Sequence, residues 1–409
     1  MAQMNLFVLG ADGVVRRAVW NSPNWDWSTL AGTTFHQGTQ ISAVSDSKGN
    51  IDVFALGTDG AVLWAQSNSG WKWASIAGAL FSQGNPMTVL RRSDTQLDFF
   101  VLGEDGVVCW AFLDGSTWHW VAITGATFKP GTPIGVGCSP DRHFMSIYVL
   151  GQDGEVRWAF QNNAGFHWAP ITGGLFNQGN RITTGMTAPG GQELYVLGED
   201  GIVRRIAWNY TTSKWDWFSL VNAAFNQGAQ VTMAPYAYVF VLGEDGAVRQ
   251  ATYQNGNWPW AAIAGAAFNQ GNPVSYMYNE NYQLNLFVLG KDGVVRQAFQ
   301  NNGQNSWPAS GWKWAAINGA AFNQNNVITC LLAGSPSAVE PPDDDDVWPW
   351  DPTNSAPENN PDIGPGGLGV DPYAPPSGSI DPEPEAPSGN GNNGNGGGGG
   401  DAGGAIRRR

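Results

Sequence analysis

Leu56-Gly57-Thr58-Asp59-Gly60 has six close copies elsewhere in the chain, and this repetition decides the fold. Each copy reads Leu-Gly-x-Asp-Gly, and successive aspartates are 47, 46, 48, 47, 45 and 47 residues apart. A fixed period of this length indicates one supersecondary unit copied around a ring or along a solenoid. The repeated aspartates are Asp12, Asp59, Asp105, Asp153, Asp200, Asp245 and Asp292.

Each repeat predicts four β-strands. In the second repeat, the runs 51–56, 61–65, 71–76 and 86–90 are rich in β-branched and aromatic residues and are bounded by turn formers. No stretch has a sustained apolar period near 3.6, so we expect no helix. The Gly-x-Asp-Gly turn joins antiparallel strands, because Gly accepts positive φ and Asp bonds to its own following backbone. Seven such units predict an all-β fold, a seven-bladed β-propeller of four-stranded antiparallel blades.

The two ends of the repeat region predict how the ring closes. The first repeat starts at Asn5 and has no preceding strand, whereas the run 327–332 after the seventh repeat is one strand too many. Placing the surplus strand in the first blade completes seven blades and removes an exposed sheet edge. We therefore predict a propeller over residues 1–334, closed by a C-terminal strand in the first blade.

Residues 335–409 differ sharply in composition. They are crowded with Pro and Gly and hold thirteen acids and three arginines, which is −10 of the chain's net charge of −14. Such a segment buries too little apolar surface to offset its ordering entropy, so we predict a disordered acidic tail. Within it, Trp348 and Trp350 leave two interpretations open: a merely solvated acidic run, or a segment that docks on a protein partner or on the propeller.

Charge and targeting signals exclude several classes. No basic stripe exists in the repeat region, which argues against nucleic acid as a partner. No basic region followed by an apolar segment precedes the first strand, and no run of about 18 apolar residues predicts a membrane span. Cys109, Cys138 and Cys330 lack metal spacing and look like small buried hydrophobes of a reducing compartment. We expect a cytoplasmic protein, or one released without a cleavable signal peptide.

No catalytic constellation stands out from the repeats. An active site on a symmetric scaffold should break the symmetry, yet His119 and His167 share one repeat position with Asp26, Lys72 and Asp216. That position tolerates many residue types, so we interpret it as exposed. No metal-ligand spacing, nucleophile triad or phosphate-cradling loop is found, and a turn explains the repeated aspartate better than calcium does. We predict no enzyme, no catalytic residue, no metal and no cofactor.

Every repeat carries an aromatic-x-Trp pair and, further on, a loop that begins Phe-x-Gln-Gly in most copies. Residues i and i+2 of a strand share one face, so the two rings of a pair lie together. The second Trp and the loop Phe are the same in all seven copies, which favours packing between blades, a contact that must repeat around the ring. The pairs are Trp25/Trp27, Trp71/Trp73, Trp118/Trp120, Phe166/Trp168, Trp215/Trp217, Trp258/Trp260 and Trp312/Trp314.

The first aromatic and the loop Gln vary among the copies, which suggests a ligand-binding role. An indole beside an amide at an inter-blade groove suits a sugar, because the ring covers apolar C–H faces and the amide bonds to hydroxyls. Packing remains the alternative for these positions. The predicted carbohydrate-binding residues are Trp25, Trp71, Trp118, Trp215, Trp258, Trp312, Gln37, Gln83, Gln178, Gln227, Gln270 and Gln324.

The fifth residue after each repeated aspartate is large, planar and able to form hydrogen bonds in every copy. Its variation fits a surface that touches ligand in some blades, and it also fits an indifferent solvent-facing position. The residues are Arg17, Trp64, Trp110, Trp158, Arg205, Gln250 and Gln297.

The stretch from Phe7 to Val15 and the tryptophan-bearing fourth strand resemble bacterial and fungal β-propeller lectins. The nearest likeness is to the seven-bladed lectins of Photorhabdus-type, insect-associated bacteria and to tectonin-type repeats. The resemblance covers about Asn5–Leu332; the Phe-x-Gln-Gly loop is not a hallmark of these families. It implies glycan binding at several equivalent sites without catalysis, often of fucose or O-methylated sugars.

Three functional hypotheses follow. The first is a multivalent lectin, whose individually weak sites gain strength through avidity. The second is a non-enzymatic protein–protein interaction scaffold that uses the propeller face and the acidic tail. The third and least favoured is a degenerate enzyme scaffold. Under the lectin hypothesis, the predicted partners are glycans or glycoconjugates. Assembly into a homo-oligomer, and binding of a protein partner to the tail around Trp348–Trp350, stay open.

Overall fold

The computed structural model describes residues 2–138, 145–162, 165–187, 191–209, 211–235, 238–254, 256–300 and 311–334. The predicted disordered tail, with Trp348 and Trp350, lies outside these residues. In the described ranges the chain forms 28 β-strands and one short 3-10 turn, η1 (Ser67–Ser69). The all-β prediction is confirmed. In the same ranges no helix has the length and hydropathy needed to cross a bilayer.

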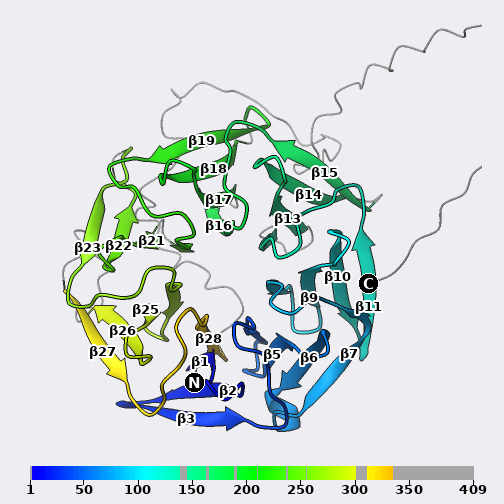
Figure 1. The fold of residues 1–409 in the computed structure, drawn as a ribbon, viewed down its shortest axis with the longest axis vertical. Helices are drawn as coiled ribbons and strands as arrows, with labels where there is room; N and C mark the ends of the chain where they lie inside the picture. Colours follow the sequence, from blue (N-terminus) through cyan, green and yellow to red (C-terminus); the bar gives the residue numbers. More distant parts are fainter. Residues whose placement is uncertain are drawn as a thin grey trace, which may run out of the picture. The chain divides into compact units, whose positions relative to one another are not determined.

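Seven four-stranded antiparallel sheets are arranged as blades around a ring, so the predicted seven-bladed propeller is confirmed (Figure 1). From the innermost strand outward, the first two blades are β28 (Thr329–Ala333), β1 (Gln3–Leu9), β2 (Val15–Asn21), β3 (Asn24–Leu30); and β4 (Ser42–Ser45), β5 (Ile51–Leu56), β6 (Ala61–Gln66), β7 (Trp73–Leu80). The third and fourth are β8 (Met87–Arg91), β9 (Leu97–Leu102), β10 (Val108–Asp114), β11 (Thr117–Ile123); and β12 (Ile134–Cys138), β13 (Met145–Leu150), β14 (Val156–Asn162), β15 (Gly165–Ile171).

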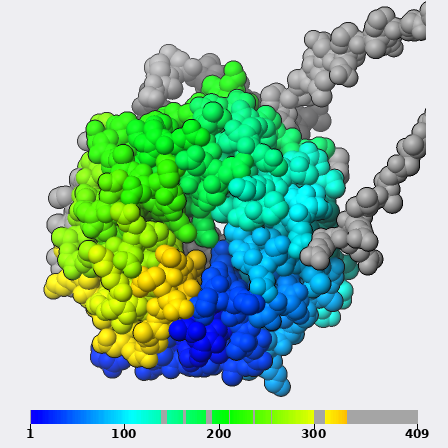
Figure 2. Space-filling model, in the orientation of Figure 1, coloured from blue at the N-terminus to red at the C-terminus, as the bar shows by residue number. Residues whose placement is uncertain are grey.

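The remaining three blades follow the same plan. They are β16 (Thr183–Thr187), β17 (Gly191–Leu197), β18 (Val203–Asn209), β19 (Lys214–Leu220); β20 (Val231–Ala234), β21 (Tyr238–Leu242), β22 (Val248–Thr252), β23 (Trp260–Ile263); and β24 (Ser275–Tyr278), β25 (Leu284–Leu289), β26 (Val295–Gln300), β27 (Trp312–Ile317). The second strand of each blade is buried on both faces, as in the all-buried patterns of β5, β9 and β25. The core is therefore a series of apolar layers, each lying between two neighbouring blades. The blades contact one another around the ring (Figure 2).

The ring closes as predicted, because β28 pairs with β1 in the first blade. The antiparallel register runs from Gln3 opposite Ala333 to Phe7 opposite Thr329. The sequence left open which strand lies nearest the centre; the structure makes the C-terminal strand β28 the innermost one.

The two sides of the ring carry different connections. On one side, which we call the loop face, lie the Gly-x-Asp-Gly turns and the loops that lead from one blade to the next. The first turn shows their construction: the Gly10 N–H donates to Val14 O at 2.8 Å, and Asp12 accepts from the Val14 N–H at 3.2 Å. Gly13 has φ +75°, and a Cβ there would lie 2.5 Å from Phe35 O, so only glycine fits. The other side, the hairpin face, carries turns between first and second strands, such as residues 46–50, and between third and fourth strands, such as residues 67–72.

The invariant aromatic residues join neighbouring blades, as predicted. At all seven boundaries the second Trp of one blade contacts the loop Phe that follows the preceding blade, with ring centroids 4.8 to 5.9 Å apart. Each of these Phe side chains is buried. The contacting pairs are Trp27–Phe322, Trp73–Phe35, Trp120–Phe81, Trp168–Phe128, Trp217–Phe176, Trp260–Phe225 and Trp314–Phe268.

Hydroxyl groups link the innermost strands. A Ser or Thr near the start of six of these strands donates to a backbone carbonyl at or just before the start of the adjacent innermost strand; the fourth blade has Gly135 at this position. These bonds form a belt around the centre of the ring. The donors are Ser42, Thr88, Thr183, Thr232, Ser275 and Thr329.

The stability of the ring should fall in alkaline solution. The Cys330 thiol on β28 donates to Tyr276 O at 2.8 Å, and burial raises the pKa of both Cys330 and Tyr276 to about 12, from ordinary values of 9.0 and 10.0. Because the folded state holds these protons more tightly, their stabilisation is complete below pH 9 and is lost progressively as the pH rises toward 12. We expect the unfolding midpoint to fall over this range, and to fall less in Cys330→Ala; a midpoint constant from pH 8 to 11 would contradict the assignment.

Candidate functional site

The predicted tryptophans lie in or immediately before the outermost strands, near the hairpin face, and all six are half-buried. Each packs against the preceding blade. The Trp25 indole N–H donates to Gln297 Oε1 at 3.0 Å, and its ring meets the edge of Phe287 at 5.9 Å. The Trp312 N–H likewise donates to Gln250 Oε1 at 3.2 Å. These residues therefore stand at blade boundaries, with part of each ring exposed.

The variable fifth-position residues are partners of these aromatics across the boundary. Trp64 meets Trp118 edge-on at 5.4 Å, and Trp158 meets Trp215 at the same distance. The Arg17 guanidinium lies 5.0 Å from the centre of the Trp71 ring. All seven fifth-position residues are half-buried or buried, so the position is not an indifferent solvent face.

The loop glutamines lie on the loop face instead. Gln227 shows the pattern: its Nε2 donates to Gly198 O at 2.8 Å, in the turn of its own blade, and its Oε1 accepts from Asn177 at 2.6 Å. All six glutamines donate to a turn carbonyl in this way. The four glutamines that also accept from an asparagine of a neighbouring loop are Gln37, Gln227, Gln270 and Gln324.

The structure does not bring the predicted tryptophans and the loop glutamines together, so their predicted adjacency is wrong. Trp25 lies opposite Trp20 at the hairpin-face end of β2. Gln37 donates to Gly10 O, which lies beyond the loop-face end of β2. Seven residues of extended strand separate the two by roughly 20 Å. The outermost strand lies between Trp and Gln in the sequence and carries the chain to the opposite face. Whether the tryptophans bind carbohydrate stays a prediction.

A polar residue in the second strand lies beside the fifth-position side chain in several blades. Asp52 accepts from the Trp64 N–H at 2.8 Å and pairs with Arg91. The third blade repeats this with Asp98, which accepts from Trp110 at 2.9 Å. The sequence reasoning missed these groups; the signal was a polar residue at one place in each otherwise apolar strand. The set is Asn5, Asp52, Asp98, Ser146, Glu193, Tyr238 and Asn285.

The fifth blade holds the most enclosed of these charged pairs. Glu193 and Arg205 form a buried ion pair, and the Tyr195 hydroxyl donates to Glu193 at 2.6 Å. Burial, and then the negative charge of Glu193, raises the pKa of Tyr195 well above its ordinary range. Tyr195 therefore stays a neutral donor, and this cluster is built for structure more than for proton transfer.

A cavity of about 390 Å³ opens on the hairpin face of the third blade, between the 92–97 and 113–115 turns. Trp110 and Phe112 form an aromatic wall, with ring centroids 4.7 Å apart. The half-buried Arg92 pairs with the buried Asp98 at 2.6 Å, and the exposed Gln96 also lines the opening. An aromatic wall with a few fixed polar groups is typical of a small-molecule site of this size.

The histidines in the described part of the chain do not form a metal-binding cluster. His119 and His167 are exposed, as predicted, and His119 stacks on Phe112 at 5.2 Å. Throughout the described ranges, no three His, Cys, Asp or Glu side chains come close enough to hold a metal ion. The turn aspartates are engaged by their own turns and, in five blades, by the arginine four residues later.

The fold of the chain has known counterparts among solved structures, whereas its sequence has none among family models or curated proteins. No protein-family model matches the chain, and no curated protein matches its sequence. Among solved structures, the BP39L lectin from Burkholderia pseudomallei is similar with a TM-score of 0.63 and 22% identity, covering 77% of this chain and 95% of that one. The chain shares the propeller fold of a known lectin. AofleA from Arthrobotrys oligospora has a TM-score of 0.51 at 14% identity, covering 73% of this chain and 90% of that one. At these identities the similarity establishes the fold alone.

Proposed function

We propose that the chain is a multivalent carbohydrate-binding protein without catalytic activity, whose sites lie on the hairpin face, within the blades and at their boundaries. The observation that carries the proposal is the third-blade cavity, where Trp110 and Phe112 stand beside the Arg92–Asp98 pair. Related aromatic and polar groups recur at the blade boundaries. The propeller fold shared with the BP39L lectin supports the same function.

The cavity suits a sugar for chemical reasons. A pyranose presents an apolar C–H face, which an indole or phenyl ring covers, and hydroxyls, which need directional hydrogen bonds. In the third blade Trp110 and Phe112 supply the apolar wall, while Arg92, held by the buried Asp98, and the exposed Gln96 supply the polar groups. The apolar wall, extended by Leu113, also suits the methyl group of fucose or of an O-methylated sugar, the sugars that the sequence resemblance implies.

The loop glutamines are left out of the proposed site, because their amides bond to turn carbonyls on the opposite face. The tryptophans stay in it as boundary aromatics. Their partners differ from blade to blade: Trp118 faces Trp64, Trp25 faces Gln297, and Trp71 faces Arg17. The sites are therefore not equivalent, and several weak sites on one ring would act together through avidity.

The proposal is tested first by a glycan array on the full chain, followed by competition with simple sugars. We expect binding that fucose or an O-methylated monosaccharide competes away. A blank array from folded protein would contradict the carbohydrate proposal and favour the protein–protein interaction scaffold.

The Trp110→Gln variant tests the cavity itself, since Gln already occupies the fifth position in the sixth and seventh blades. We expect one fewer bound sugar per chain in calorimetric titration, because loss of the aromatic wall weakens that site by about tenfold, roughly 1.4 kcal/mol. His167→Gln, an exposed substitution in the next blade, is the control and should leave the stoichiometry unchanged. Unchanged binding by Trp110→Gln would remove the third-blade cavity from the site.

A further inference from the structure

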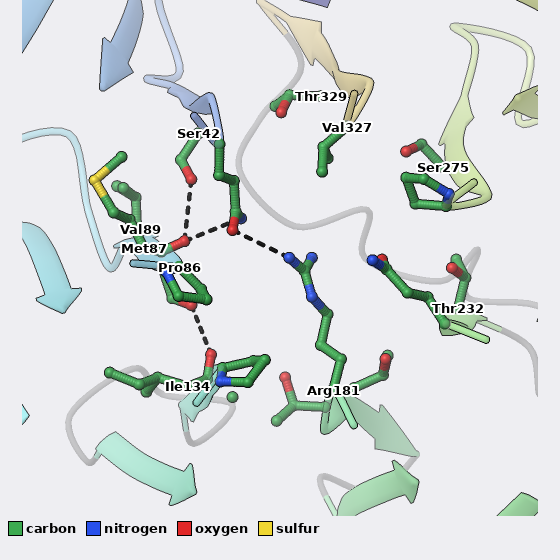
Figure 3. Close-up of a pocket in the computed structure, with 18 of the residues that line it drawn as sticks. Ser42, Pro86, Met87, Val89, Ile134, Arg181, Thr232, Ser275, Val327 and Thr329 are labelled. Carbon is green, nitrogen blue, oxygen red and sulfur yellow. Dashed lines mark hydrogen bonds between the residues drawn. The ribbon is translucent and has the colours of Figure 1, made fainter. Parts of the chain in front are cut away.

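The centre of the ring contains a second cavity, separate from the proposed sugar sites. It has a volume of about 390 Å³ and is lined by the starts of the innermost strands and by the residues just before them. Ser42, Thr232, Ser275 and Thr329 lie around it, and their hydroxyls belong to the belt of inter-strand bonds (Figure 3). Because these residues follow the inter-blade loops, the cavity lies toward the loop face, whereas the third-blade cavity opens on the hairpin face.

One position in each blade, two residues before the belt residue, rings this cavity, and the seven copies differ. Six of them are uncharged: Gln40, Pro86, Pro133, Gln230, Pro273 and Val327. The fifth blade has Arg181 instead, which breaks the symmetry with a positive charge. Arg181 is the one charged side chain among the described residues that line the cavity.

Arg181 reaches across the ring. Its Nη2 donates to Gln40 Oε1 at 3.0 Å, although Gln40 belongs to the second blade and Arg181 to the fifth. Figure 3 shows the guanidinium projecting into the middle of the cavity, toward the side of Ser42 and Val327. A guanidinium carries five N–H donors, so most remain for a further acceptor.

No carboxylate within the described ranges compensates this charge. Eight other arginines each pair with an Asp or Glu side chain, from Arg16 with Asp12 to Arg296 with Asp292. Arg181 has no such partner among them. Burial lowers the pKa of Arg181, and no nearby acid acts in the opposite direction. A guanidinium that is partly removed from water and lacks a counter-ion is poised to bind an anion.

We propose that the central cavity binds one small oxyanion on the Arg181 guanidinium. The ligand class is an inorganic phosphate or sulfate, or the carboxylate of a small organic acid, each of which accepts two parallel N–H bonds from guanidinium. The lining is otherwise uncharged, so a single negative group is matched by a single positive one. This site is independent of the sugar sites, because it uses different residues and the opposite face.

The experiment uses the full chain at constant ionic strength, with chloride replaced in turn by inorganic phosphate, sulfate and acetate. A ligand that binds only the folded state raises the thermal midpoint in a saturable manner. We expect at least one of these anions to do so in the wild type, with one anion bound per chain in calorimetric titration. The pattern among the three anions separates a phosphate or sulfate site from a carboxylate site.

The decisive variant is Arg181→Gln, because Gln already occupies this ring position in the second and sixth blades. We expect at least tenfold weaker anion binding and no saturable rise in midpoint. Arg249→Gln removes a half-buried arginine paired with Asp245 on the loop face and should keep the full response. Arg181→Lys retains the charge without the forked donors and should bind with intermediate affinity. A wild type that responds to none of the three anions, or an equal response in Arg181→Gln, overturns the proposal.

Discussion

A chain that ends at residue 326, without β28, is expected to lose its cooperative unfolding transition and to aggregate. The deletion removes the innermost strand of the first blade and leaves β1 with an unpaired inner edge from Gln3 to Phe7, where it had paired with β28. An exposed edge strand in the middle of a ring is a template for pairing with other chains. The expected result is therefore loss of the native state, not a modest shift in midpoint.

The size of the effect follows from what β28 contacts on both sides. Ile328 and Ala333 are buried, and each belongs to a different inter-blade core layer. The strand also supplies links of the central belt: Thr329 donates to Ile41 O, and Ser275 donates to Ile328 O. Losing one buried aliphatic side chain costs about 2–5 kcal/mol, and a whole domain is stable by only about 5–15 kcal/mol.

Circular dichroism and thermal denaturation of the truncated chain check this prediction. The matched control ends at Gly334 and keeps β28 while lacking residues 335–409. On the composition of that segment we expect the control to melt within a few degrees of the full chain. A chain ending at 326 that melts like the control would show that the first blade does not depend on the C-terminal strand.

The fold was predictable because every blade repeats the same local rules. The Asp12 turn, the invariant Trp27 and the loop Phe35 each serve one purpose that recurs seven times, so period and strand pattern suffice to predict the ring. Even the closure followed from counting strands, since an unpaired run at one end needed a partner at the other.

The candidate site was harder, because it depends on which face each residue reaches. Trp25 and Gln37 are near in sequence, but β3 lies between them and carries the chain from the hairpin face to the loop face. The important groups are also those that break the repeat. Asp98 occupies a position in the second strand at which the polar residue changes from blade to blade. Arg181 is a single charge at a position held in the other blades by Gln, Pro or Val. Their meaning appears only when the blades are set around a common centre.

Replacement of Phe176 by alanine is expected to cost about 3–5 kcal/mol of unfolding free energy, the usual range for deleting a buried phenyl ring. Phe176 is 1% exposed and stacks on Trp217 of the following blade at 5.9 Å. Its backbone N–H donates to Gly154 O at 2.9 Å, and this bond is retained in the variant. The loss therefore isolates the side chain's contribution to the contact between the fourth and fifth blades.

Leu175 is the control, because it precedes Phe176 in the same loop and is 58% exposed. Leu175→Ala should change the unfolding free energy by no more than about 0.5 kcal/mol. Chemical denaturation of the three proteins compares the effects directly. If Phe176→Ala were as mild as Leu175→Ala, inter-blade aromatic contacts would not be what holds the ring together. A large loss confined to Phe176→Ala, with the same circular dichroism spectrum before unfolding, would instead place the stability of the propeller at its seven blade boundaries.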